Sequence, residues 1–173
     1  MHPPDADVSI VLGSGTWNEL QAHRLFSQTY VPACSPALFA RTPITTIDQL
    51  DGQTLLVFEA RKDGWERWAE SAGLQLPRPR KRIAFNNMSS LVRATERSAG
   101  IGLIPATLST ERFRAKSLTR LLDHEWTTED SYFLVHRAEV AARPEVIAFR
   151  KWILDELLTG LNAPVPGAGN GSA

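Results

Sequence analysis

The chain has 173 residues, of which 43% are hydrophobic and 22% are charged, values typical of one globular domain or of two small lobes that share a core. Lys and Arg together number 19, as do Asp and Glu, so the formal net charge is zero. The whole chain therefore lacks the excess of positive charge that is typical of nucleic-acid-binding proteins. A single cysteine, Cys34, excludes a disulfide framework and favours the cytosol.

Membrane-spanning and secretory segments are not evident in the sequence. No apolar run approaches the ~18 residues of a membrane span. Residues 1–5 do not form a charged region followed by an apolar stretch, as a secretory signal would. We therefore expect a cytoplasmic protein without a membrane partner.

The first predicted strand covers residues 7–12, where apolar residues alternate. It ends in a glycine loop, residues 13–17, which is a weak phosphate-binding motif because it lacks a third glycine and a following helix pattern. Trp17 in this loop could either stack on a ligand or cover the edge of the core. A second extended stretch follows at residues 23–34, and its apolar pattern predicts that Cys34 is a buried thiol.

Short elements and one amphipathic helix come next. Pro36 stands at the first position of a predicted helical turn, and residues 46–49 have the pattern of a capping box. Residues 54–58 predict a strand, and a helix that ends at Gly73 follows it. The apolar face of this helix carries residues predicted to belong to the core: Trp65, Trp68, Ala69 and Ala72.

Residues 82–105 predict a strand, a helix and a second, parallel strand. The helix is expected to begin near Asn87 and to end at Gly100. In open α/β sheets ligands sit at the carboxyl ends of strands, where helix N-termini supply unpaired N–H groups. Residues 86–90 are therefore the first place where we expect a bound small molecule. The alternative is that Asn87 and Ser89 only cap the helix, which every buried helix start requires.

The C-terminal third has a weaker pattern. Residues 109–114 predict a short helix, residues 117–122 a turn into an edge strand, and residues 126–130 a loop before a strand at 131–136. Pro144 opens a strongly amphipathic helix. The apolar stripe of this helix consists of Val146, Phe149, Ile153, Leu157 and Leu161.

Strands and helices alternate along the chain, so the predicted fold class is α/β. Residues 162–173 are rich in Pro, Gly and Ala and predict a disordered tail. The four histidines have no metal-ligand spacing, and the sequence contains no acid–base pair or nucleophile motif. We therefore expect no enzyme, no metal and no cofactor, and ligand binding remains as the default function of a pocketed α/β chain.

Several short segments stand in a specific order and spacing: residues 7–10, 15–17, 25–26, 31–38, 46–50, 63–68, 85–90, 99–105, 131–135 and 143–149, with Trp152. Together they resemble the effector-binding domain of LysR-type transcriptional regulators. The resemblance is closest to the group that includes the glycine-cleavage and β-lactamase regulators. It covers residues from about 5 to about 158.

The resemblance implies a type 2 periplasmic-binding-protein-like fold, in which two α/β lobes are joined by crossing strands and a ligand lies in the cleft. It assigns residues 1–35 to an incomplete lobe one with the first crossing strand, and residues 36–104 to lobe two. Residues 105–161 would hold the second crossing and the C-terminal part of lobe one, and residues 162–173 the tail.

The resemblance and the residue pattern point to the same contacts. In the family, the helix start that matches residues 87–89 faces the effector, as does the turn that matches residues 34–35. The predicted ligand-binding residues are Thr16, Trp17, Ser35, Asn87, Met88 and Ser89. We expect the ligand to be a small polar or anionic metabolite.

The predicted function is that of a small-molecule effector-binding domain of a LysR-type regulator, truncated at its N-terminus. Because no winged helix-turn-helix precedes Met1, we expect no direct DNA binding by this chain. The first strand, helix and second strand of lobe one are also missing, which exposes residues 7–12 and predicts a homo-oligomer or dependence on a partner. The alternatives are an inactive regulator fragment, a solute-binding protein of the same fold and an enzyme on this fold.

Overall fold

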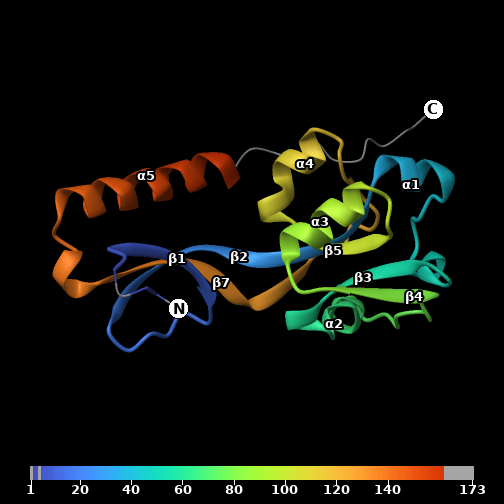
Figure 1. The fold of residues 1–173 in the computed structure, drawn as a ribbon, viewed down its shortest axis with the longest axis horizontal. Coiled ribbons are helices and arrows are strands. Elements are labelled where there is room, and N and C mark those ends of the chain that lie inside the picture. The colour runs from blue at the N-terminus through green and yellow to red at the C-terminus, as the bar shows by residue number, and fades with distance from the viewer. Residues whose placement is uncertain (1, 4, 162–173) are drawn as a thin grey trace. The chain divides into compact units, whose positions relative to one another are not determined.

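The structure is a computed structural model that describes residues 2–3 and 5–161, so the tail predicted for residues 162–173 lies outside the described part of the chain. The chain divides into two compact units, which can be followed by colour in Figure 1. Unit 1 holds the residues up to Gln28 and those from Thr127 onward, and unit 2 runs from Thr29 to Trp126. The chain therefore crosses between the units twice. The lobe boundaries expected from the sequence stay a prediction.

Unit 1 is built on β1 (Val8–Gly13), β7 (Trp126–Arg137) and the first part of β2 (Leu20–Cys34). The strand order is β1-β7-β2, which leaves β1 at the edge. β1 runs antiparallel to β7, with Val8 opposite His136. The extended stretches predicted before and after the glycine loop are thus confirmed.

Helix α5 (Pro144–Leu161) is the long C-terminal helix of unit 1. Its predicted stripe is buried at Val146 and half-buried at Phe149, Ile153 and Leu157. The side chain of Leu161, the last residue of the predicted stripe, lies outside the described residues. Within residues 2–3 and 5–161, neither α5 nor any other helix combines the length and the apolar content that a membrane crossing requires.

Residues 126–130 form a strand and not the predicted loop, because β7 already begins at Trp126. Burial alternates along this stretch: Trp126 and Thr128 are buried, and the residues that follow each of them are exposed. The period of two was not evident from hydrophobicity, because after Trp126 the stretch consists of threonines and acidic residues. Thr128 tolerates its buried position because its hydroxyl donates a hydrogen bond to the carbonyl oxygen of Gln28, at 3.3 Å.

In unit 2 the strand order is β2-β5-β3-β4, where β5 is Ile101–Pro105, β3 is Thr54–Phe58 and β4 is Lys81–Phe85. β3 is parallel to both β4 and β5, whereas β5 is antiparallel to β2. The strand, helix and strand predicted between residues 82 and 105 are confirmed as β4, α3 (Met88–Glu96) and β5. β4 and β5 are not hydrogen-bonded neighbours, however, because β3 lies between them.

Helices cover both faces of the unit 2 strands (Figure 1). Helix α2 (Gly64–Ser71) packs on the face that carries Leu55 and Val57, whereas α3 packs on the face that carries Leu56. The period of two along β3 therefore produces two separate apolar clusters. The remaining elements of unit 2 are α1 (Pro36–Arg41), α4 (Thr110–Arg114), β6 (Thr119–Arg120), which pairs with β2, and 3-10 turns at Ile47–Leu50, Glu59–Arg61 and Thr107–Ser109.

Trp65 and Trp68 of α2 belong to the core, as predicted, with exposed fractions of 1% and 0%. Their rings meet edge to face, with centroids 5.9 Å apart and planes at 80°. Each indole N–H donates to a backbone carbonyl, Trp65 to that of Leu56 at 3.0 Å and Trp68 to that of His124 at 3.1 Å. Because both donors are satisfied, the two rings anchor α2 without a polar penalty.

The two helix ends predicted at glycines differ in outcome. Gly73 follows α2 with φ of 69°, as expected for a glycine after a helix. α3 already stops at Glu96, and Ser98 takes the left-handed conformation with φ of 62°, so the prediction for Gly100 is wrong. Gly100 instead allows the backbone of residue 100 to pack closely against that of Thr54, since a Cβ there would lie 2.6 Å from the carbonyl oxygen of Thr54.

Candidate ligand-binding site

A small pocket opens in unit 2 at the carboxyl end of β3. Phe58, the last residue of β3, and Met88, the first residue of α3, both line it. The other lining residues are Tyr30, Leu56, Arg61, Gly64, Trp65 and Leu103. The enclosed space is about 10 Å³, close to that of one water molecule. The pocket can therefore hold one end of a ligand but not a whole metabolite.

The start of α3 lies beside this pocket and brings three predicted site residues together. Asn87 is the N-cap, and its side-chain oxygen accepts a hydrogen bond from the backbone N–H of Ser90 at 3.1 Å. The capping role that the sequence left open is thus present. Asn87 and Ser89 are exposed, and Met88 is half-buried in the pocket wall. First-turn N–H groups without intrahelical partners give this end of the helix a partial positive charge.

Ser35, another predicted site residue, is not brought to the start of α3. Its side chain is 2% exposed, and its oxygen accepts a hydrogen bond from the backbone N–H of Leu38, at 3.1 Å, at the start of α1. The same oxygen lies 2.6 Å from the hydroxyl of Ser98, which follows the C-terminal end of α3. The nine residues of α3 span roughly 13 Å, so Ser35 lies near the opposite end of the helix from Asn87.

Thr16 and Trp17 belong to the glycine loop of unit 1. Thr16 is exposed and Trp17 is half-buried. The Trp17 ring meets Phe133 edge to face at 5.2 Å, and Gly15 adopts φ of 95° directly against the same Phe133 ring. Of the two roles left open for Trp17, covering the edge of the core is therefore present in the structure.

Arg61 is a pocket residue that sequence reasoning missed. Its Cζ lies 5.7 Å from the ring centroid of Tyr30 and 5.4 Å from that of Trp126. In the sequence it stands in a run of charged residues, which is typical of a solvated turn. The available signal was its position three residues after the strand at residues 54–58, near the edge where α/β sheets place functional side chains.

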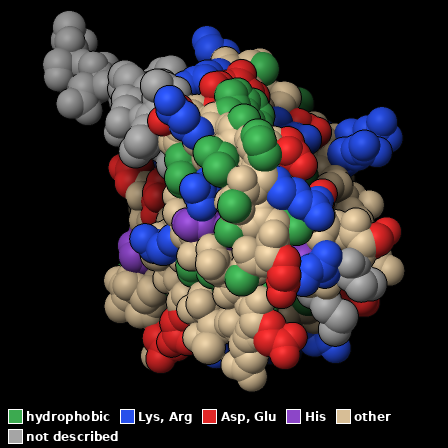
Figure 2. Space-filling view, turned by 90° about the vertical axis from the view of Figure 1, so that its left-hand side faces the viewer, with side chains coloured by type: hydrophobic (Ala, Val, Ile, Leu, Met, Phe, Trp, Pro, Cys, Tyr) green, Lys and Arg blue, Asp and Glu red, His purple; other side chains and the backbone are tan. Residues whose placement is uncertain are grey.

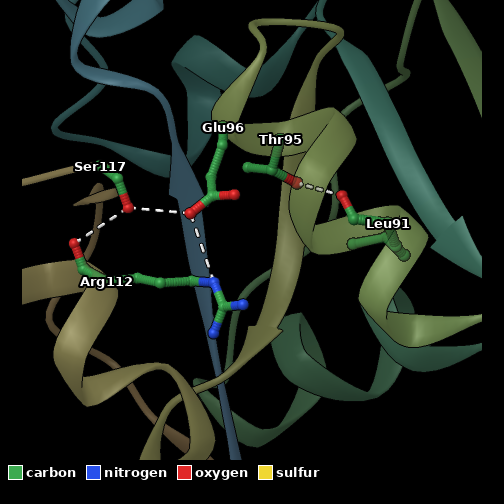
Figure 3. A network of polar contacts seen from close by, with 5 residues as sticks. All are labelled: Leu91, Thr95, Glu96, Arg112 and Ser117. Atoms are coloured by element: carbon green, nitrogen blue, oxygen red, sulfur yellow. Dashed lines mark hydrogen bonds and ion pairs between the residues drawn. The ribbon is translucent and has the colours of Figure 1, made fainter.

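A polar network fixes the other end of α3 (Figure 3). Glu96 Oε1 accepts a hydrogen bond from the hydroxyl of Ser117 at 2.8 Å and pairs with Arg112 Nε at 3.3 Å. One residue earlier, the buried hydroxyl of Thr95 donates to the carbonyl oxygen of Leu91 at 2.9 Å. α3 is thus held to α4 and the following turn at its C-terminal end, while its N-terminal end borders the pocket.

Other reactive side chains lie away from the pocket. Cys34 is fully buried, as predicted, and burial raises the pKa of its thiol to about 11, so the thiol stays protonated at neutral pH. In unit 1, the Nε2 atoms of His23 and His136 lie 3.2 Å apart. In the part of the chain that the structure describes, no group of three His, Cys, Asp or Glu side chains could hold a metal ion.

Comparison with known families identifies the chain. The family model of the LysR substrate binding domain matches residues 4–158. The chain belongs to the LysR substrate-binding domain family. This LysR domain is 26% identical over 151 residues to the glycine cleavage system transcriptional activator of Escherichia coli K12, a match that covers 87% of the chain and 49% of the activator. It thus spans about half the length of the curated relatives it matches.

Solved structures show the same relationship. The effector domain of the transcriptional regulator AmpR of Pseudomonas aeruginosa superposes with a TM-score of 0.74 at 27% identity, over 88% of this chain and 73% of that one. The AmpR effector binding domain from Citrobacter freundii superposes with a TM-score of 0.76 at 23% identity, over 88% of this chain and 75% of that one. The LysR domain therefore has the type 2 periplasmic-binding-protein-like fold. The family and the fold class predicted from the sequence are both confirmed.

Proposed function

We propose that this LysR substrate-binding domain is the effector-binding part of a LysR-type transcriptional regulator and binds a small polar or anionic metabolite at the start of α3. The observation that carries the proposal is the pocket at the carboxyl end of β3, because its wall includes Met88. Open α/β sheets bind ligands at this edge of parallel strands. The family supports the same role, since the matched Escherichia coli relative is a transcriptional activator.

The chemistry of the α3 start suits an anion. Unpaired N–H groups and the helix dipole favour negative charge. The exposed side chains of Asn87 and Ser89 add hydrogen-bonding groups beside them. Thr16 and Trp17 of the glycine loop stay predictions from the sequence. We assign Ser35 a structural role. Its hydroxyl accepts the hydrogen bond at the start of α1 and contacts Ser98, which follows the end of α3.

The proposal assigns neither catalysis nor direct DNA binding to this chain. The family role rests on recognition of a metabolite, and a net charge of zero gives little attraction for phosphate backbones. A regulator of transcription acts where the bacterial chromosome is, so we place the domain in the cytoplasm. A gel-shift assay at physiological salt that finds sequence-selective, sub-micromolar DNA binding would contradict this part of the proposal.

Exposed apolar side chains in unit 1 support association with a second copy or a partner. Ile10 and Leu12 of the edge strand β1 are 51% and 41% exposed, and Trp152 of α5 is 57% exposed. Figure 2 shows apolar side chains grouped at the surface among charged ones. Apolar edge strands favour pairing with other chains. Light scattering at micromolar concentration should find an oligomer, and a monodisperse monomer would contradict this expectation.

The binding proposal is tested with a metabolite found by thermal-shift screening and then measured by calorimetry. The double variant Asn87→Ala/Ser89→Ala should weaken binding by about 1–3 kcal/mol, the loss expected for hydrogen bonds to a charged group. Because Asn87→Ala also removes the N-cap, the variant Asn87→Asp/Ser89→Ala is the sharper test. Asp caps as well as Asn, yet its charge should repel an anion.

Ser90→Ala is the matched control, since it changes an exposed hydroxyl on the same turn and keeps the backbone N–H that Asn87 binds. Its affinity should equal that of the wild-type chain. Unchanged affinity in the folded Asn87→Asp/Ser89→Ala variant would remove the α3 start from the site.

A further inference from the structure

Positive charge is concentrated in one part of unit 2, although the charges of the whole chain cancel. Residues 93–120 contain six of the 19 Lys and Arg residues but only two of the 19 Asp and Glu residues. This segment includes the C-terminal part of α3 and all of α4, which both belong to unit 2. A surface with such a local excess attracts acidic groups even when the net charge of the chain is zero.

The two acidic residues of this segment are already paired. Glu96 Oε1 lies 3.3 Å from Arg112 Nε and accepts a hydrogen bond from the hydroxyl of Ser117 at 2.8 Å (Figure 3). Glu111 Oε1 lies 2.6 Å from Arg114 Nη1. Each carboxylate thus offsets the charge of one arginine, and neither pairs with the other cations of the segment.

Three exposed cations of the segment, Arg93, Arg97 and Lys116, have no Asp or Glu partner within the described part of the chain, which includes every acidic residue of the sequence. The backbone N–H of Arg97 bonds to the carbonyl oxygen of Arg93 at 3.1 Å, so their side chains leave neighbouring turns of α3. Glu96, which precedes Arg97, contacts the hydroxyl of Ser117. Lys116 directly precedes Ser117. The three cations therefore lie near one another and form the α3–α4 cationic surface.

An exposed apolar side chain stands at the start of α4. Leu108 is 50% exposed and belongs to the 3-10 turn Thr107–Ser109, which leads directly into α4. The hydroxyl of Thr110, the first residue of α4, donates to the carbonyl oxygen of Thr107 at 2.9 Å and fixes the turn to the helix. The five residues of α4 span roughly 8 Å, so one short peptide can reach both Leu108 and Lys116. Protein interfaces combine an apolar contact with surrounding polar ones in this way.

We propose that the α3–α4 cationic surface docks an acidic peptide segment of a partner protein, in which several Asp or Glu residues surround one apolar side chain. Carboxylates of the segment pair with Arg93, Arg97 and Lys116, and its apolar residue covers Leu108. A guanidinium binds a carboxylate with two parallel hydrogen bonds, which makes Arg clusters suitable sites for acidic motifs. This inference concerns a surface at the end of α3 that lies opposite the pocket, and it does not depend on the proposed function.

Two other occupants fit this surface less well. A nucleic acid offers phosphates for the cations but no aliphatic side chain for Leu108. A second copy of the chain offers no acidic run, because the sequence nowhere has more than two adjacent Asp or Glu residues. A flexible acidic segment can instead adapt to cations that stand on two helices and in the turn after them.

The test uses two fluorescein-labelled peptides of equal length, in which either Glu or Gln residues surround one Leu. Fluorescence anisotropy measures their binding to the whole chain at increasing NaCl concentration. The Glu peptide should bind with an affinity that falls as the NaCl concentration rises, because exposed charges are screened. The Gln peptide should bind at least about tenfold more weakly, the loss expected for several exposed ion pairs.

Substitutions on the surface should separate its charges from its apolar contact. The triple variant Arg93→Gln/Arg97→Gln/Lys116→Gln should bind the Glu peptide about tenfold more weakly than the wild-type chain, with a smaller dependence on salt. Leu108→Ser should weaken binding as well but should keep the salt dependence of the wild-type chain, because it removes an apolar contact and no charge.

The matched control is Arg78→Gln/Arg80→Gln/Lys81→Gln, which removes three exposed cations elsewhere in unit 2. Both triple variants have the same net charge, and the control should keep the affinity of the wild-type chain for the Glu peptide. An equal loss of affinity in the two triple variants overturns the inference, because the attraction would then be one of net charge. No binding of the Glu peptide at millimolar concentration and low salt overturns it as well.

Spectra of the ¹⁵N-labelled wild-type chain give a readout that does not depend on any variant folding. The Glu peptide should shift the amide signals of Arg93, Arg97, Leu108 and Lys116. Shifts confined to signals outside residues 93–120 overturn the inference. Duplex DNA that binds these residues more tightly than the Glu peptide also overturns it, as does an oligomer that the surface triple variant converts to a monomer in light scattering. Either result assigns the surface to another occupant.

Discussion

The hydroxyl groups of Ser35 and Ser98 lie 2.6 Å apart, although the two residues are 63 positions apart in the sequence. This contact joins the residue between β2 and α1 to the turn that follows α3. Ser98 reaches it from a left-handed backbone conformation, with φ of 62°. A non-glycine residue in that conformation costs about 1–2 kcal/mol. The hydrogen bond therefore offsets a local strain at the end of the helix whose other end borders the pocket.

Substitutions at Ser98 should separate the strain from the hydrogen bond. Ser98→Ala loses the bond and keeps the strain, whereas Ser98→Gly loses the bond and removes the strain. Chemical denaturation should find Ser98→Ala less stable than Ser98→Gly by about 1 kcal/mol. Equal stabilities of the two variants would contradict the assignment of strain to this position.

Gly102 of β5 is required by the close packing of α3. A Cβ at this position would overlap the hydroxyl of Thr95 and would lie 2.8 Å from Ile104 Cδ1. Gly102→Ala should therefore lower the free energy of unfolding by about 1–3 kcal/mol, as overpacking of a core does. Adding Thr95→Ala should recover part of that loss, because it removes the overlapping oxygen.

Gly64→Ala is the control for this prediction. A Cβ at Gly64 meets its nearest neighbour, Leu103 Cδ2, at an ordinary 3.4 Å. Since Ala is the better helix former, this substitution should be neutral or slightly stabilising. A Gly102→Ala variant as stable as Gly64→Ala would mean that α3 does not pack on β5 as closely as the structure indicates.

His23 should make the stability of the fold depend on pH. Burial, the charge of Arg150 and the neighbouring His136 hold the pKa of His23 below its ordinary value of 6.5. At a pH below 6.5 the unfolded chain therefore binds more protons at this residue than the folded chain, and stability falls as the pH falls. Well above that value both states are neutral at His23, and its contribution no longer changes.

Urea denaturation between about pH 5 and pH 8 tests this prediction. The wild-type chain should lose more stability on the acid side than His23→Gln, which cannot be protonated. Arg150→Gln should reduce the loss, because it removes one of the causes of the pKa shift. Parallel pH profiles for the wild type and His23→Gln would show that His23 does not carry the effect.

Cys34 should be unreactive in the folded chain. It is fully buried, its sulfur donates a hydrogen bond to the carbonyl oxygen of Ser35 at 3.3 Å, and its pKa is raised to about 11. A disulfide reagent near neutral pH should therefore label it only when the protein opens, and urea should accelerate the labelling. Complete labelling of the native protein as fast as that of free cysteine would contradict its burial.

The parts of the fold that were predictable are those where burial follows a simple period. β3, α3 and α5 present their apolar residues at spacings of two or of three and four, and those of the residues that the structure describes are buried or half-buried. The start of β7 was not predictable in this way, because its buried Thr128 relies on a hydrogen bond to Gln28 from a distant strand. Likewise, the end of α3 depends on Ser98 and Ser35 meeting in space.

In the candidate site, too, the residues that share a local sequence pattern were predicted, and the residue that depends on distant contacts was not. Asn87, Met88 and Ser89 are adjacent in the sequence, and the rule that helices begin after strands placed them correctly at the start of α3. Arg61 was missed, because its aromatic partners, Tyr30 and Trp126, come from strands far away in the sequence, and only its position after β3 pointed to it. Where the surroundings of a side chain are formed by residues distant in the sequence, the neighbouring sequence gives little indication of its role.

Binding of a metabolite at the start of α3 is tested most directly by mapping amide shifts in ¹H–¹⁵N correlation spectra, with a metabolite identified by thermal shift. The proposed site predicts that the largest shifts occur at Met88, Ser89 and Ser90 and are lost in Asn87→Asp/Ser89→Ala. Saturable shifts confined to residues away from α3 and from the pocket beside it would contradict the assignment of this site.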